Sequence, residues 1–123
     1  MLKGSYYPLV PYLTRLNVQQ LVLEFATPRA GELAALLSND EIRARKELGL
    51  GVVNPRLEEI EPVEAIVSRV EDTLRYLPPD RIFLNPDCGF GTFSSRPVNG
   101  AATAAKTLKN IAAAVCLLRD KCR

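Results

Sequence analysis

The chain has 123 residues, of which 47% are hydrophobic and 24% are charged, and its formal net charge is +2. This composition predicts a single soluble globular domain over residues 1–123, and the charge is too small to indicate a nucleic-acid partner. The N-terminus lacks the apolar stretch of a signal peptide, and no apolar run reaches the roughly 18 residues of a membrane span, so no membrane partner is expected.

The first 47 residues predict a leading helix and one strand–helix unit. Apolar side chains recur at helical spacing over 7–13, and the apolar segment 21–26 has the length of a strand. Segment 31–37 predicts a helix whose three leucines point inward, and 38–40 ends it. The charged stretch 41–47 alternates basic and acidic residues, which indicates a solvent-exposed connection.

The second unit begins with a glycine-containing strand over 48–53 and turns at 54–56. Apolar residues over 63–77 follow the i, i+3, i+4, i+7 spacing of an amphipathic helix. Pro62 suits the start of this helix, and Pro78 with the following proline ends it.

The third unit consists of a strand over 81–85, a long loop and a final alanine-rich helix that begins after Gly100. The side of this helix expected to be buried consists of Ala101, Ala104, Ala105, Leu108, Ile111, Ala112, Val115 and Leu118.

Strands that alternate with helices, each strand apolar almost throughout, predict an α/β fold with three parallel strands covered by helices. Three parallel strands leave both edges of the sheet open for pairing. A complete eight-unit barrel needs about 250 residues, so this chain holds well under half of one. We therefore expect a homo-oligomer, or another chain that completes the sheet.

Each predicted strand has polar side chains at its carboxyl end. Glu24 comes from the first strand, Asn54 and Arg56 from the second, and Asp87 and Cys88 from the third. Because the carboxyl ends of parallel strands share one rim, where ligands bind in α/β proteins, these groups are expected to converge. A thiolate at such a rim is a soft metal ligand or a nucleophile.

Each of these side chains also has a purely structural interpretation. Glu24 can pair with Arg29 instead, Asp87 can cap its own turn, and Arg56 can anchor a loop. A free cysteine such as Cys88 also packs as a small hydrophobe. The residues alone leave both interpretations open.

The chain contains three cysteines and no histidine. The odd number of cysteines, without recognisable spacing, predicts reduced thiols and a cytoplasmic protein. The lack of histidine excludes Ser–His and Cys–His nucleophile pairs and every metal site with a histidine ligand, unless another chain supplies the histidine.

Three segments resemble successive motifs of a known family. Residues 23–31 (Leu-Glu-Phe-Ala-Thr-Pro-Arg-Ala-Gly), 49–56 (Gly-Leu-Gly-Val-Val-Asn-Pro-Arg) and 85–93 (Asn-Pro-Asp-Cys-Gly-Phe-Gly-Thr-Phe) are similar, in order and spacing, to motifs of the C-terminal catalytic domain of cobalamin-independent methionine synthase and its shorter relatives. The resemblance runs from about Gly4 to Arg119, and Asn-Pro-Asp-Cys-Gly is its most specific motif.

The resemblance implies a (βα)8 TIM barrel with a zinc ion at the carboxyl rim of its strands, of which this chain would be the last three βα units. It implies that Glu24 and Cys88 are two of the zinc ligands. The other two family ligands, a His-x-Cys pair, belong to a strand that would precede Gly4. We therefore expect half of a metal site here, and little or no zinc bound by the chain alone.

The loop after the second strand departs from the family pattern. Methionine synthases proper have an aspartate and a histidine at the positions of Asn54 and Arg56, and the histidine serves as an acid. Arginine keeps its proton near neutral pH, so Arg56 can bind an anion but not act as a general acid. By the same resemblance, Asp87 is expected to support the site or contact the substrate amine. Asn54, Arg56 and Asp87 are therefore the predicted substrate-binding residues, and no catalytic residue is assigned.

The family chemistry is transfer of a methyl group from a methyl-folate-type donor to a thiol such as homocysteine, whose pKa zinc lowers. The first hypothesis is a fragment or subunit of such a methyltransferase, inactive alone. The second is a non-catalytic, self-associating α/β module derived from that family. A third is a thiol-binding relative within the wider superfamily of uroporphyrinogen decarboxylases and coenzyme M methyltransferases.

Overall fold

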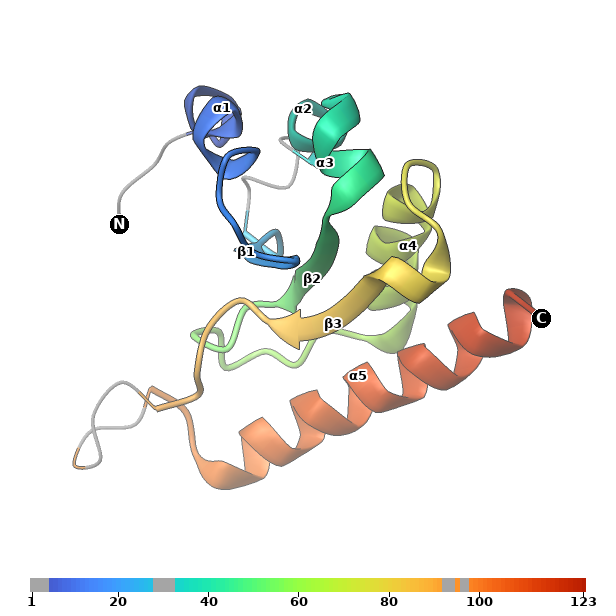
Figure 1. Cartoon of the computed structure of the whole chain (residues 1–123). Helices are drawn as coiled ribbons and strands as arrows, with labels where there is room; N and C mark the ends of the chain where they lie inside the picture. The colour runs from blue at the N-terminus through green and yellow to red at the C-terminus, as the bar shows by residue number, and fades with distance from the viewer. Residues whose placement is uncertain (1–4, 28–32, 92–94, 96–97) are drawn as a thin grey trace.

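A computed structural model of the chain describes residues 5–27, 33–91, 95 and 98–123. Its three strands form one parallel sheet in the order β1-β2-β3 (Figure 1), with β1 at Gln20–Glu24, β2 at Glu47–Val53 and β3 at Ile82–Pro86. The helices are η1 (Tyr7–Leu9), α1 (Val10–Leu13), α2 (Leu33–Leu37), α3 (Asp40–Arg45), α4 (Val63–Leu74), η3 (Pro79–Arg81) and α5 (Ala101–Lys121). The prediction of three parallel strands alternating with helices is confirmed.

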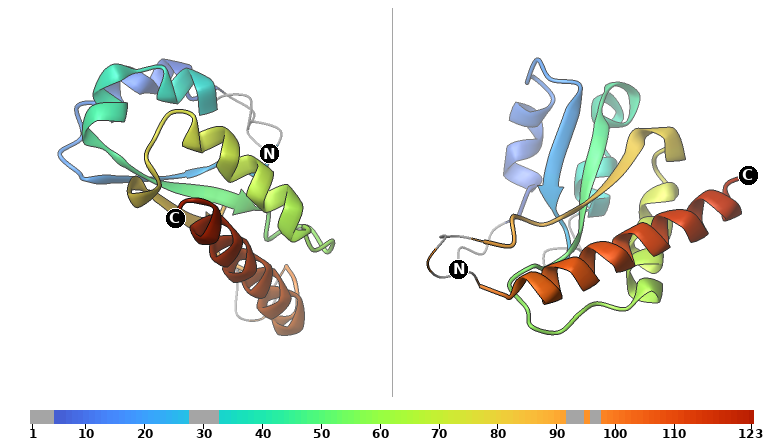
Figure 2. Two further views of the ribbon diagram at one scale, coloured as in Figure 1. Left: turned by 90° about the vertical axis from the view of Figure 1, so that its right-hand side faces the viewer. Right: turned by 90° about the horizontal axis from the view of Figure 1, so that it is seen from below.

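One face of the sheet packs against the helices. Figure 2 shows the helices following one another in an arc around the sheet, from α1–α3 through α4 to α5. On this face, Leu48, Leu50 and Val52 of β2 are almost completely buried. They share one hydrophobic core with Leu36 and Leu37 of α2, Ile42 of α3, and Ile66 and Val70 of α4.

The opposite face of the sheet is open at its centre. The strand register places Val22 of β1 and Phe83 of β3 on either side of Gly49. Val22 is 61% exposed and Phe83 is 46% exposed, because no helix of the described chain covers them. Successive residues of a strand alternate between faces, so Glu24 and Gly51 lie further along this same face.

The segment after α2 is a helix, and its interpretation as a solvent-exposed connection is wrong. The side chain of Asn39 accepts a hydrogen bond from the backbone N–H of Ile42 at 3.1 Å, which caps the first turn of α3. Acidic residues in the first turn and arginines in the last turn complement the helix dipole. Ile42 is the single buried residue of α3, so this helix shows no apolar periodicity and only its capping signal marks it.

The buried side of α5 agrees with the predicted one at Ile111 and Leu118 and differs from it at other positions. Thr107, Ile111, Ala114 and Leu118 are buried, whereas Leu108 of the predicted stripe is 48% exposed. Alanines occur on all sides of α5, so hydrophobicity alone does not fix which side faces the core. Thr107 tolerates burial because its hydroxyl donates to the backbone oxygen of Thr103 at 3.0 Å.

By length and composition alone, α5 is long and apolar enough to cross a membrane, contrary to the sequence expectation. One such helix is weak evidence for a membrane span, because helices of water-soluble proteins pass the same test. In this fold α5 lies against α4 and β3 as the last member of the helical arc.

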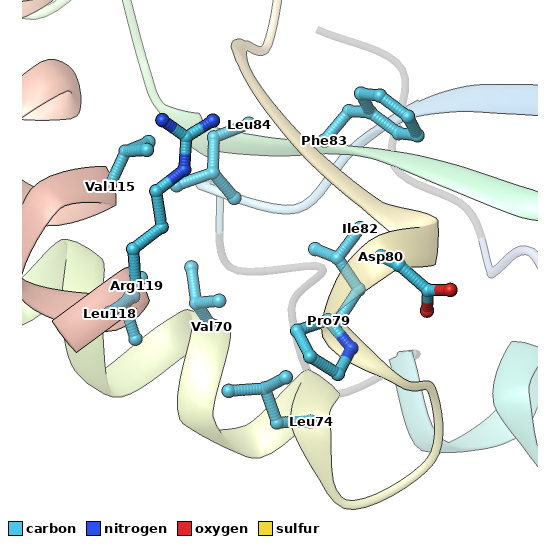
Figure 3. A pocket seen from close by; sticks show the side chains of 10 residues that line it. All are labelled: Val70, Leu74, Pro79, Asp80, Ile82, Phe83, Leu84, Val115, Leu118 and Arg119. Atoms are coloured by element: carbon cyan, nitrogen blue, oxygen red, sulfur yellow. The ribbon is translucent and has the colours of Figure 1, made fainter. Parts of the chain in front are cut away.

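A cavity of about 370 Å³ lies between α4, α5 and the outer strand β3. Figure 3 shows Val70 and Leu74 of α4 and Leu118 of α5 around this space, with Arg119 extending along one side of it. The cavity lies beside β3, which is an edge strand of the sheet in the described chain, and α5 lines one side of it.

Candidate functional site

The structure places the predicted site residues at the carboxyl ends of the three strands. Glu24 is the last residue of β1, Asn54 follows β2, and Asp87 and Cys88 follow β3. Because the strand order is β1-β2-β3, Glu24 and Cys88 belong to strands separated by β2, and not to neighbouring strands. Any contact between them has to cross the end of β2.

Asp87 forms hydrogen bonds across the end of β2. Its backbone N–H donates to the backbone oxygen of Val53 in β2 at 2.9 Å. Its carboxylate oxygen Oδ1 accepts hydrogen bonds from the backbone N–H groups of Phe25 and Ala26, directly after β1, at 3.1 Å each. One residue therefore connects the carboxyl ends of all three strands.

Gly51 of β2 makes room for this carboxylate. A Cβ atom on Gly51 would overlap Asp87 Oδ1, and it would lie 2.8 Å from the backbone oxygen of Leu23 and 3.1 Å from the Cα of Glu24. Glycine in a strand interior often marks the close approach of another group, and here that group is the carboxylate of Asp87, the residue directly after β3.

The environment of Asp87 is unusual for a carboxylate. Burial raises its pKa above the ordinary value of 3.8, the hydrogen bonds from Ala26 and Phe25 oppose this increase, and the negative charge of Glu24 adds to it. The second oxygen, Oδ2, is buried and has no hydrogen-bond partner in the described part of the chain. A hydrogen-bond donor at this rim is therefore missing from the described residues.

Glu24 is positioned through its backbone by Tyr6. The hydroxyl of Tyr6 accepts from the backbone N–H of Glu24 at 3.2 Å and lies 3.3 Å from its backbone oxygen. The Tyr6 ring also packs against Phe25, with ring centroids 5.5 Å apart. No sequence signal marked this role of Tyr6. The alternative pairing of Glu24 with Arg29 lies outside the described residues.

Asn54 and Arg56 belong to the turn after β2. The side-chain oxygen of Asn54 accepts from the backbone N–H of Arg56 at 3.1 Å, so this side chain already stabilises its own turn. The side chain of Asn99 donates to the backbone oxygens of Pro55 and Leu57 at 2.6 and 2.8 Å, a role that no specific sequence signal marked. Arg56 is exposed and forms no ion pair with any described residue, so its guanidinium is open to a ligand.

Cys88 is half-buried with a free thiol, like the exposed Cys116 and Cys122. Within the described ranges, no group of three or more histidine, cysteine, aspartate or glutamate residues is arranged to hold a metal ion. A catalytic zinc site needs three protein ligands and one open position. The described residues therefore do not by themselves fit a zinc ion, since they offer at most one thiolate and nearby carboxylates.

Comparison with known proteins supports one family. Residues 4–114 match the model of the catalytic domain of cobalamin-independent synthases. The methionine synthase of Pyrococcus abyssi is 33% identical over 118 residues, which cover 96% of this chain and 32% of the relative. That of Pyrococcus horikoshii is 39% identical over 88 residues, which cover 70% of this chain and 24% of the relative.

The fold agrees with this match. The structure of a B12-independent methionine synthase from Shewanella sp. W3-18-1, in complex with selenomethionine, superimposes with a TM-score of 0.75 at 16% sequence identity. The superposition covers 94% of this chain and 31% of the other. The chain thus spans about a quarter to a third of the length of the proteins it matches.

Proposed function

Because the chain belongs to the family of catalytic domains of cobalamin-independent synthases, we propose that it is one part of a zinc-dependent methyltransferase. In this proposal it supplies Glu24 and Cys88 to a zinc site that another chain completes. The reaction class is methyl transfer from a methyl-folate-type donor to a thiol such as homocysteine. The described chain is expected to be inactive alone, because its ligand set is incomplete.

The observation that carries the proposal is the connection made by Asp87. Its carboxylate links the segment just after Glu24 to the third strand, one residue before Cys88. The two proposed ligands are thus attached to the two ends of one hydrogen-bonded bridge. The free thiol of Cys88 and the nearby negative charge of Glu24 are consistent with a cation site at this rim.

Three features support a partner that completes a (βα)8 barrel. The face with Val22 and Phe83 is open, and it is the face that would line the barrel interior. The cavity beneath α5 lies where a further strand would pair with β3. Finally, two buried side-chain oxygens at the rim, Thr27 Oγ1 and Asp87 Oδ2, have no hydrogen-bond partner among the described residues.

The substrate contacts follow from the same rim. Arg56 presents an exposed cation suited to an anionic group of a folate-type donor or of an amino-acid thiol. Asn54 lies in the same turn and Asp87 is close to Glu24, so all three remain proposed substrate-binding residues. The three free thiols support a reducing, cytoplasmic location.

The proposal is tested by reconstitution. The chain is mixed with the N-terminal part of the Pyrococcus abyssi methionine synthase, ending where its match to this chain begins. We expect zinc retained through a chelator wash, and methionine formed from homocysteine and methyltetrahydrofolate, in the mixture only. Cys88→Ser should abolish both, whereas Cys116→Ser, which removes an exposed thiol from α5, should leave both intact. Stoichiometric zinc in the chain alone would overturn the proposal.

A second candidate function follows from the open sheet face and edges, namely a non-catalytic module that associates with itself. Sedimentation of the purified chain separates the two candidates. A stable dimer that neither binds the complementary fragment nor acquires zinc with it favours the module. A monomer that becomes a one-to-one complex favours the enzyme.

A further inference from the structure

We propose that Asp87 is a positioning residue, which fixes the end of β1 that carries Glu24 against the end of β3 that carries Cys88. This inference rests on the proposed function, in which both residues bind the same ion. It assigns Asp87 a role through its neighbours, in addition to any contact with substrate.

The geometry leaves the Asp87 carboxylate little freedom. Its own backbone is held by β2 through Val53, and its Oδ1 is held by two N–H groups of the segment after β1. The carboxylate reaches them over Gly51, the position where any side chain would collide with it. A glycine in the middle strand and an acidic residue directly after the third strand thus form one connection between the strand ends.

The connection through Asp87 lies where the hydrogen-bonded pairing of β1 and β2 ends. The last paired residues are Glu24 and Gly51, so Phe25 and Ala26 have left the sheet. Without Asp87 their N–H groups lose their acceptor, and the chain after Glu24 is free to move away from β3. The position of Glu24 relative to Cys88 then depends on the Tyr6 hydroxyl and on the ladder behind it.

The first test measures amide hydrogen exchange in the metal-free chain. Asp87→Ala should accelerate exchange at Phe25 and Ala26 by about tenfold relative to Leu50 in the centre of the sheet. Gly51→Ala should do the same with Asp87 still present, because the added methyl group displaces the carboxylate. Asp87→Asn keeps one acceptor oxygen and should retain most of the protection. Asp72→Ala, which removes an exposed carboxylate from α4, is the matched control.

The second test measures whether the hydrogen bonds of Asp87 affect the affinity of the site for a metal ion. The probe is Cd²⁺, followed by its thiolate absorption band, added to the mixture of this chain with the N-terminal part of the Pyrococcus abyssi methionine synthase, with Cys116 and Cys122 of this chain both changed to serine. Glu24→Gln should weaken Cd²⁺ binding about tenfold when Asp87 is present, and less than about twofold in the Asp87→Ala background. A residue that only stabilises the fold would leave the effect of Glu24→Gln the same in both backgrounds.

The outcomes separate the inference from the proposed function. If Glu24→Gln weakens Cd²⁺ binding equally with and without Asp87, the positioning role is wrong although the shared ion stands. If Glu24→Gln or Cys88→Ser has no effect in the parent chain, the shared ion is wrong. In that case the exchange experiment alone decides whether Asp87 holds the two strand ends together. Unchanged exchange at Phe25 and Ala26 in Asp87→Ala overturns the inference outright.

Discussion

The two faces of the sheet differ in what holds them together. The helix-covered face is built from large apolar side chains such as Leu48 and Leu50, which pack into one continuous core. On the open face, the middle strand carries Gly49 and Gly51, and neighbouring side chains lie over both glycines, with Asp87 over Gly51. The covered face is therefore stabilised by buried area, whereas the open face depends on a few specific contacts between strands.

The strongest test of this difference compares leucine and valine truncations on the two faces. Leu50→Ala removes a side chain that is only 1% exposed, and it should lower the free energy of unfolding by about 2–5 kcal/mol. Val22→Ala on the open face of the neighbouring strand should cost less than about 0.5 kcal/mol, because Val22 is already solvent-exposed. Urea unfolding followed by circular dichroism measures both. Equal losses would mean that the open face is covered in solution, as in a dimer.

A second test examines the glycines of the open face. Gly51→Ala introduces a methyl group that overlaps Asp87 Oδ1 and the Leu23 carbonyl, and it should cost about 1–3 kcal/mol of unfolding free energy. Gly89→Ala is the matched control, since a Cβ there would meet nothing within 4 Å. If the two variants are equally stable, Asp87 does not occupy the space over Gly51.

The covered face also contains α3, the helix that the hydrophobic pattern missed. Asn39→Ala removes the side-chain acceptor for the Ile42 N–H and should lower the free energy of unfolding by about 1 kcal/mol. Ser38→Ala, one residue earlier and exposed, should change it by less than about 0.5 kcal/mol. The same urea titrations measure this pair, and equal effects would contradict the capping role of Asn39.

The features of this fold that depend on local sequence pattern were predictable from the sequence. The apolar runs located all three strands, and the amphipathic spacing over 63–77 located α4. The sequence did not predict the packing of the helices in which the apolar pattern is weak. In α3 only Ile42 is apolar and buried, and in α5 the alanines lie on every side. Neither the alternation of charges nor the number of apolar residues shows which side of such a helix packs against the core.

For the candidate site, the sequence identified the strand ends but not the contacts between them. Glu24, Asp87 and Cys88 were predicted at the rim because each lies at the carboxyl end of an apolar run, and the strand order then places β2 between the two proposed ligands. The hydrogen bonds of Asp87 join residues 61 and 62 positions apart. No local pattern specifies such a contact, although the glycine at position 51 marks the place where it crosses.

The smallest effect expected is a change in pH dependence, and it tests whether the Asp87 carboxylate is buried on the open face. A carboxyl group with a raised pKa in the folded state binds more protons when folded, over the interval between its ordinary pKa of 3.8 and its folded pKa. The contribution of this carboxyl group to stability is therefore present below pH 3.8 and is lost as the pH rises through the folded pKa.

Asp87→Asn removes this loss, so the unfolding free energy of the variant relative to the parent chain should increase as the pH rises toward neutrality. Urea titrations of both chains across this range, with chelator present, give the difference. A constant difference would show that the hydrogen bonds from Phe25 and Ala26 balance the cost of burial, and a difference that decreases with pH would show that they outweigh it.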